Sequence, residues 1–233
     1  MLDFSSVRGI TFDCYGTLIA WEPGLLDAIR PILSAHGAEL SDAEILRLYG
    51  EIEAEEESGA YRPYKEILRA VVRGFGTRLG FAPSEKEQQS LPESLPNWKP
   101  FPDTVAALHR LKEKFNLGII SNIDDDLFAA TAPRLGVVFD HVITAAQARA
   151  YKPSLEIFNL AEKKIGLPRN QWLHAGQSVY HDVVPAKSLG IASVWVNRPS
   201  RNPGVGAVRP ASQKPDLQVS SLQELADIVI PGT

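Results

Sequence analysis

Four stretches of the chain place a polar or reactive side chain at the end of a short apolar run. The first run ends at Asp13, and the second ends at Ser121 and Asn122. The loop after the third run reaches Lys152, and the fourth run is followed within a few residues by Asp182. Ligands of open parallel sheets bind beyond the carboxyl ends of the strands, so we expect these groups to meet at one sheet edge.

This set of groups suits covalent catalysis by a carboxylate. Asp13 can attack an electrophilic centre and form an ester or an acyl phosphate. Lys152 would keep Asp13 ionised and offset the charge of an anionic substrate, and Asp182 can position or deprotonate water. Taken singly, each residue also has a structural interpretation as a turn former, a helix cap or a surface lysine. The order of the four groups, each at a different predicted strand end, favours the chemical interpretation.

Strands that alternate with helices would position these groups. Short buried runs bounded by polar loops are typical of strands in a parallel sheet, and such a sheet carries helices on both faces. Amphipathic spacing predicts helices over 155–165 and 222–230, and Asp103 is expected to cap another helix. The runs expected as strands are Val7–Asp13, Asn116–Ser121, His141–Thr144, Trp172–Ala175 and Ala192–Val196.

Residues 21–98 break this alternation, because they show helical patterns and no strand. Pro31 is expected to kink or shorten the first of these helices. Ser41 and Glu44 form a capping box that opens the second, and an apolar face over 67–79 marks a third. The sequence therefore predicts an α/β fold with two parts, a Rossmann-like three-layer core over 1–20 and 99–233 and an inserted helical cap over 21–98.

Composition limits the classes of protein that fit. The chain has 233 residues with a formal net charge of −4 and no basic cluster, which argues against nucleic-acid binding. A single cysteine, Cys14, rules out a disulfide within the chain and fits a reducing compartment. No apolar run is long enough to span a bilayer, and no signal region is evident at the N-terminus. A cytoplasmic protein that binds neither nucleic acid nor membrane is expected.

Four motifs carry a resemblance to a known family. They are FDCYGTL at 12–18, ISN at 120–122, YKP at 151–153 and GQSVYHD at 176–182. Jointly they resemble the haloacid dehalogenase superfamily, over nearly the whole length of the chain. The resemblance implies a Rossmann-like core, a helical cap inserted after the first motif, and Asp13 as the nucleophile.

Two positions separate this chain from the magnesium-dependent phosphatases that form most of that superfamily. Tyr15 stands where their general acid, a second aspartate, is found, and Gln177 replaces an acid of their fourth motif. The chain instead resembles type II 2-haloacid dehalogenases, which need no metal or other cofactor. In the implied mechanism Asp13 displaces halide from C2 of a short haloacid, and water assisted by Asp182 and Lys152 cleaves the resulting ester. A halide leaves without a proton, so a general acid at position 15 is dispensable.

The resemblance also implies a substrate-binding set. Thr17, Ser121 and Asn122 would orient Asp13 and bind the substrate carboxylate. Arg62 is the nearest basic candidate for the cap arginine that stabilises the leaving halide in well-characterised members, although it does not align securely with that residue. The other expected contacts are Cys14, Tyr15, Gln177 and Ser178, and the aromatic residues expected to line an apolar pocket are Tyr15, Trp21, Tyr61, Tyr64 and Trp98.

Two alternatives stay open at this point. A phosphatase of the same fold could use a magnesium site made by Asp13, the Tyr15 carbonyl and Asp182. A catalytically idle binding protein is the other alternative, and the intact set of Asp13, Lys152 and Asp182 argues against it. The expected partner is a small anionic substrate, and a homodimer is expected only by analogy with relatives.

Overall fold

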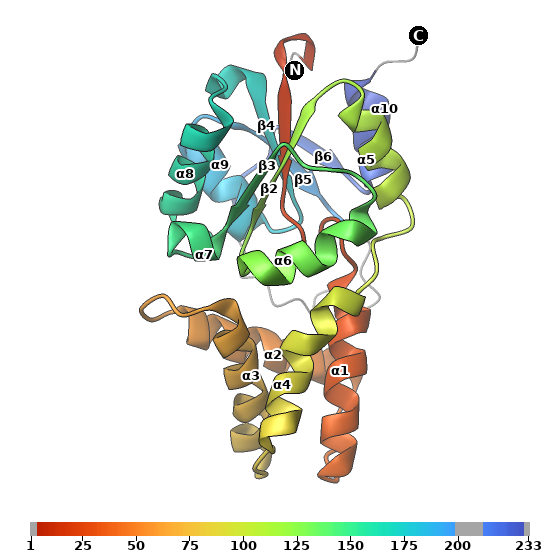
Figure 1. Cartoon of the computed structure of the whole chain (residues 1–233), viewed down its shortest axis with the longest axis vertical. Helices are drawn as coiled ribbons and strands as arrows, with labels where there is room; N and C mark the ends of the chain where they lie inside the picture. The colour runs from red at the N-terminus through yellow and green to blue at the C-terminus, as the bar shows by residue number, and fades with distance from the viewer. Residues whose placement is uncertain (1–3, 199–211, 231–233) are drawn as a thin grey trace.

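The computed structural model describes residues 4–198 and 212–230 (Figure 1). Residues 1–3, 199–211 and 231–233 lie outside the described part. The expected outer boundaries of the core, at residues 1 and 233, therefore lie outside the described residues. Within the described ranges, no helix has both the length and the apolarity needed to cross a membrane.

A six-stranded sheet forms the centre of the upper half of the molecule in Figure 1. Every neighbouring pair of strands is parallel, and the order is β3-β2-β1-β4-β5-β6. The five expected strands are all present. The sixth strand, β6, was not predicted because it has only three residues. The strands are β1 (Gly9–Phe12), β2 (Asn116–Ser121), β3 (His141–Thr144), β4 (Trp172–Gly176), β5 (Ala192–Val196) and β6 (Leu217–Val219).

Helices cover both faces of the sheet and confirm the expected α/β class (Figure 1). On one face lie α7 (Ala145–Ala148), α8 (Leu155–Ile165) and α9 (Val184–Ser188). On the other face α5 (Thr104–Lys112) packs against α10 (Leu222–Val229). A further helix, α6 (Asp125–Thr131), follows β2 near the carboxyl ends of the strands.

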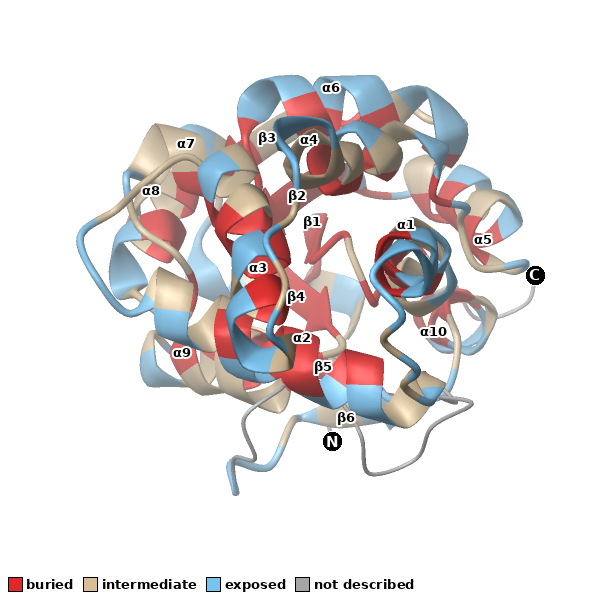
Figure 2. Cartoon of the chain, turned by 90° about the horizontal axis from the view of Figure 1, so that it is seen from below, coloured by how far each residue is buried: buried red, intermediate tan, exposed pale blue. Residues whose placement is uncertain are grey.

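Four helices between β1 and α5 gather below the carboxyl ends of the strands (Figure 1). They are α1 (Trp21–Ala35), α2 (Asp42–Glu57), α3 (Tyr64–Leu79) and α4 (Glu85–Ser94), here called the helical segment. The expected capping box of Ser41 and Glu44 opens α2. In Figure 2, which looks from this end of the molecule, buried residues lie on the inward sides of the helices.

Two features of the helical segment were not predicted. Pro31 does not shorten α1, which continues to Ala35, because Pro31 is on the exposed side of the helix and the buried stripe continues past it through Ile32 and Leu33. The polar, proline-containing stretch after 83 contains the second such feature, the helix α4. The signal for α4 was a second capping box, in which Ser84 accepts from the backbone of Glu87 and the Glu87 side chain accepts in return.

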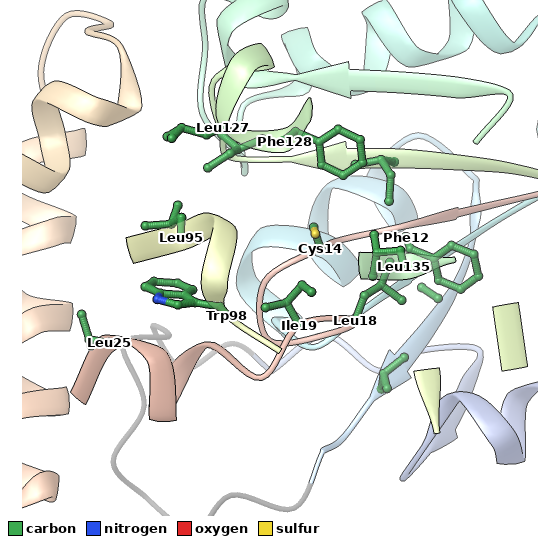
Figure 3. Close-up of a cluster of buried hydrophobic side chains, with 14 of the residues drawn as sticks. Phe12, Cys14, Leu18, Ile19, Leu25, Leu95, Trp98, Leu127, Phe128 and Leu135 are labelled. Atoms are coloured by element: carbon green, nitrogen blue, oxygen red, sulfur yellow. The ribbon is translucent and has the colours of Figure 1, made fainter. Parts of the chain in front are cut away.

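Apolar side chains join the helical segment to the sheet (Figure 3). Leu25, Leu95 and Trp98 come from the helical side, and Ile19 and Leu127 come from the core side. All five are buried, and they belong to one continuous hydrophobic cluster. The two parts of the chain therefore share apolar surface beside the strand ends, where the reactive residues are expected.

Asp103 caps α10 rather than α5, the helix that it was expected to cap. No side-chain cap bond joins it to α5, which it precedes. Its Oδ2 instead accepts from the backbone nitrogens of Leu222 at 2.7 Å and Gln223 at 3.2 Å, at the start of α10. Its Oδ1 accepts from the guanidinium of Arg198 at 2.6 Å, and that guanidinium also donates to the carbonyl of Thr17 at 3.0 Å. A buried arginine thus ties the loop after β1 to the opposite end of the chain.

We predict that Arg198→Ala lowers the free energy of unfolding by about 2 to 3 kcal/mol, since hydrogen bonds to charged groups contribute about 1.5–3 kcal/mol. Chemical denaturation followed by circular dichroism measures this change. The matched control is Arg110→Ala, which removes an exposed pair with Asp227 and should cost less than about 1 kcal/mol. Equal losses in the two variants would contradict the assigned role of Arg198.

Candidate active site

The reactive residues gather where the strand order reverses. β1 lies between β2 and β4, so the loops that follow β1 and β4 diverge at their carboxyl ends, and such a switch point is the usual ligand site of an open sheet. Asp13 directly follows β1, and Asp182 lies in a single π-helical turn, Val179–Val183, after β4. Lys152 reaches the same place from the loop between α7 and α8.

The ammonium group of Lys152 bridges the two carboxylates. Its Nζ donates to Asp13 Oδ1 at 2.9 Å and to Asp182 Oδ1 at 2.6 Å. A third bond goes to the backbone carbonyl of Ile120 at 3.0 Å, so all three ammonium hydrogens have acceptors. Lys152 is only 3% exposed, and a cation buried to this extent requires such partners.

Asn122 fixes the backbone of Lys152. Its side-chain Oδ1 accepts from the Lys152 N–H at 2.6 Å, and its Nδ2 donates to the Lys152 carbonyl at 3.2 Å. The expected role of Asn122 was to orient Asp13 and bind the substrate carboxylate. In the structure its amide holds the lysine in place, which leaves one N–H of Nδ2 for another acceptor.

A directed chain of hydrogen bonds holds Asp182. Trp172 Nε1–H donates to Thr11 Oγ1 at 2.8 Å, so the Thr11 hydroxyl is free to donate to His174 Nδ1, which lies 2.8 Å away. His174 Nε2–H then donates to Asp182 Oδ1 at 3.1 Å. The backbone N–H of Ser178 donates to the second oxygen of Asp182 at 3.2 Å.

A glycine is required beneath Asp182. A Cβ built on Gly176 would lie 2.3 Å from Asp182 Oδ2, far inside van der Waals contact. The absence of a side chain at the end of β4 therefore lets the carboxylate fold back toward Lys152.

Thr17 connects Asp13 to the fourth motif. Its hydroxyl donates to Asp13 Oδ2 at 2.8 Å and accepts from the backbone N–H of Gln177 at 2.9 Å. Asp13 therefore has one oxygen fixed by Lys152 and the other by Thr17. Thr17 is therefore placed to fix the orientation of the Asp13 carboxylate.

The two carboxylates have opposite pKa shifts. Burial is the largest effect on Asp13 and raises its pKa, and the charge of Asp182 adds to this rise while Lys152 and Thr17 oppose it. Burial also acts to raise the pKa of Asp182, but Lys152 and His174 outweigh it and hold that pKa well below the usual range. Burial lowers the pKa of Lys152, yet the charges of Asp13 and Asp182 prevail and raise it. Lys152 is therefore charged at neutral pH.

A cavity of about 110 Å³ opens beside these groups. Its walls come from the sheet edge on one side and from the helical segment on the other. Four of the five aromatic residues expected to line a pocket do so, and Tyr61 does not. The lining residues are Asp13, Tyr15, Trp21, Tyr49, Glu53, Glu57, Tyr64, Leu95, Trp98, Ser121, Asn122, Lys152, Gln177, Ser178, His181 and Asp182.

Three expected contacts lie away from this lining. Cys14 is fully buried in the apolar cluster of Figure 3, and burial is the main cause that raises the pKa of its thiol. Thr17 is fully buried behind Asp13. The guanidinium of Arg62 bonds the side chain of Glu56 and its carbonyl, the latter at 3.0 Å, so the structure does not place Arg62 at the cavity. The contacts of Arg62 therefore do not support the expected role of this residue in stabilising the leaving halide.

Two residues at the site were not predicted from the sequence. His174 was not predicted as a site residue, although its side chain lies on the same face of β4 as position 176 and contacts Asp182. Glu53, which lines the cavity from α2, was also not predicted. The helical spacing of Tyr49 and Glu53, four residues apart on one face, was the available signal.

The donor set does not fit a magnesium centre. Mg²⁺ prefers six oxygen ligands, several of them from carboxylates, water or substrate. Asp13 and Asp182 share the single positive charge of Lys152 and already accept its hydrogen bonds, and Gln177 offers an uncharged amide where a third acid would be needed. Within the described residues, no group of three or more histidine, cysteine, aspartate or glutamate side chains is arranged to hold a metal.

Known proteins resemble this chain over its whole length. A curated (S)-2-haloacid dehalogenase of Pseudomonas fluorescens is 26% identical, with 97% of each chain covered. A glyceraldehyde 3-phosphate phosphatase of Methanocaldococcus jannaschii is also 26% identical, with 96% of this chain and 97% of the relative covered. Among solved structures, an L-2-haloacid dehalogenase from Xanthobacter autotrophicus with chloropropionic acid covalently bound has a TM-score of 0.81. It is 21% identical, covers 97% of this chain and 100% of its own, and shows that the fold is shared.

The family of haloacid dehalogenase-like hydrolases matches residues 7–190, a range that contains Asp13, Lys152 and Asp182. This match spans well over half of the chain and includes all four motifs. The chain belongs to the haloacid dehalogenase-like hydrolases.

Proposed function

We propose that this protein is a 2-haloacid dehalogenase-like hydrolase that removes halide from short 2-haloalkanoic acids of S configuration. The observation that carries the proposal is the single ammonium of Lys152 bridging Asp13 and Asp182 at the sheet switch point. The similarity to curated (S)-2-haloacid dehalogenases supports the same reaction class.

In the first step an ionised Asp13 oxygen attacks C2 of the haloacid. The carbon–halogen bond breaks, its electron pair leaves with the halide, and an ester to Asp13 forms. Ser121, Asn122 and Ser178 line the cavity on the sheet side and supply hydroxyl and amide groups for the substrate carboxylate. The halide needs no proton, which suits Tyr15, whose hydroxyl is 2.9 Å from Thr131 Oγ1 and whose pKa is raised by burial.

In the second step water attacks the carbonyl carbon of the Asp13 ester. Asp182, ionised because of Lys152 and His174, positions this water and accepts its proton. The bond between the Asp13 acyl carbon and the oxygen on C2 breaks, and the proton held by Asp182 passes to that oxygen. The 2-hydroxy acid leaves, and Asp13 releases the second proton of the water and returns to its carboxylate form. Water is consumed, and one halide and one proton are released per turnover.

The helical segment is proposed to act as a cap over 21–98, since its residues form one wall of the cavity and Trp98 closes against Tyr15 with ring centroids 5.8 Å apart. No cofactor is needed in the proposed mechanism. A homodimer and a cytoplasmic location stay predictions.

A small-molecule phosphatase is the second candidate. The similarity to glyceraldehyde 3-phosphate phosphatase over nearly the full length favours it. Lys152, which already occupies one oxygen of both carboxylates, and the uncharged Gln177 weigh against it.

We predict that halide release from (S)-2-chloropropionate persists in EDTA and is lost in Asp13→Asn, because the amide cannot serve as the nucleophile. A halide-release assay measures both effects, and Asp27→Asn, at an exposed aspartate of α1, is the control that should keep full activity. Phosphate release from a small phosphoester that requires Mg²⁺ and stops in EDTA would instead establish the phosphatase.

Lys152→Met should reduce halide release by about 100-fold or more, since removal of one preorganised electrostatic group costs about 10²–10³ in rate. Methionine keeps most of the side-chain length but leaves two buried carboxylates facing each other, so one must take up a proton. Steady-state kinetics measures the loss, and far-UV circular dichroism confirms that the variant is folded. A folded variant with near wild-type turnover would exclude the assigned role.

The acid side of the pH profile should report Asp13. Its pKa is raised from 3.8, and it must be ionised to attack, so kcat/KM should fall as the pH decreases through a midpoint above 3.8. Thr17 lowers that pKa through its hydrogen bond, so Thr17→Val should move the midpoint to higher pH. The profile is measured by initial halide release between pH 4 and 9, and a midpoint that moves downward in the variant would contradict this account.

A further inference from the structure

The wall of the cavity that faces the sheet edge is formed partly by acidic and phenolic side chains of the helical segment. Tyr49, Glu53 and Glu57 come from α2, and Tyr64 comes from α3. The relatives named above include enzymes for anionic haloacids, yet this wall carries carboxylates. The negative charge at this end of the cavity therefore would not favour a substrate that is only an anion.

Glu53 is held in a defined position. Its Oε1 accepts from the hydroxyls of Tyr49 and Tyr64, each at 2.5 Å, and the two hydroxyl oxygens lie 3.1 Å apart. Within the described part of the chain no hydrogen bond ends on Oε2. The tyrosines thus fix one oxygen of a carboxylate that lines the cavity, and the other is available to a bound molecule.

The charges around the cavity favour a cation at this end. The described residues of its lining include the carboxylates of Asp13, Glu53 and Asp182, and Lys152 is the single lysine or arginine in that described set. Lys152 already bonds both Asp13 and Asp182 and does not bond Glu53. Burial raises the pKa of Glu53, and a cation placed next to it would favour the ionised form.

We propose that Glu53 is a specificity-determining residue that accepts a hydrogen bond from an ammonium group at the distal end of the substrate. The inference rests on the proposed function for the reacting end, where Asp13 attacks C2. The substrate class is then a short 2-haloacid that also carries an amino group, rather than a simple haloalkanoate. An arginine at this wall would repel such a group, and a carboxylate attracts it.

A pair of substrates with equal numbers of heavy atoms tests this proposal. The pair is (S)-2-chloro-3-aminopropanoate and (S)-2-chlorobutanoate, which differ by an ammonium in place of a methyl group. The wild type should show a kcat/KM at least about tenfold higher for the amino acid, which corresponds to about 1.4 kcal/mol. Halide release is measured with the uncatalysed rate subtracted.

Glu53→Gln should bring that ratio close to one, because the amide keeps an oxygen for the two tyrosine hydroxyls but loses the charge. Glu53→Leu makes the same prediction if the glutamine variant does not fold. Glu51→Gln is the matched control, since Glu51 is exposed on the same helix, pairs with Arg47 and does not line the cavity. It should keep the wild-type preference.

Calorimetric binding of the two products, 3-amino-2-hydroxypropanoate and 2-hydroxybutanoate, separates this inference from the proposed function. If no substrate releases halide but the amino product binds at least about tenfold tighter and Glu53→Gln removes the difference, the ammonium-binding role of Glu53 stands and the dehalogenase proposal fails, together with the haloacid substrate class. If halide is released from both substrates at similar kcat/KM and the products bind equally, the inference is overturned and the dehalogenase proposal stands. A preference that survives in both Glu53→Gln and Glu53→Leu also overturns it.

Discussion

The arrangement of the site depends on one buried cation. Lys152 is almost completely removed from water, and such a charge is tolerated only when its hydrogen bonds and its charge are both compensated. Asp13, Asp182 and the Ile120 carbonyl supply this compensation, and Asn122 fixes the backbone that carries the lysine. The positions of both carboxylates follow from this requirement.

One lysine between two acids gives the acids different properties. Asp182 also receives the His174 N–H and the Ser178 backbone N–H, so its ionised form is strongly favoured. Asp13 receives fewer donors and is affected by the charge of Asp182, so its ionised form is less stabilised. A weakly stabilised carboxylate is the better nucleophile, and a permanently ionised one can hold water and take up its proton. The division of roles in the proposed mechanism therefore has an electrostatic origin.

The sheet edge and the helical segment contribute different parts of the function. The loops after β1, β2 and β4 and the loop between α7 and α8 bring the reacting groups together, and their motifs carry the family relationship. The opposite wall is formed by side chains of α2 and α3, where Glu53 is fixed by two tyrosines. Because fold and chemistry are shared across the family while this wall is built by the inserted helices, the choice of substrate is expected to lie there.

The α/β class and five of the six strands were predictable from the sequence, and Asp13, Lys152 and Asp182 were named from it as candidate site residues, because short apolar runs and strand-end polar groups are local patterns. It did not reveal α4 or β6, whose polar or very short sequences gain stability from packing rather than from periodicity. Three contacts became known only from the tertiary structure: Arg62 pairs with Glu56, His174 bonds Asp182, and Glu53 lines the cavity. Those outcomes depend on which faces of distant elements meet, and a linear pattern does not contain that information.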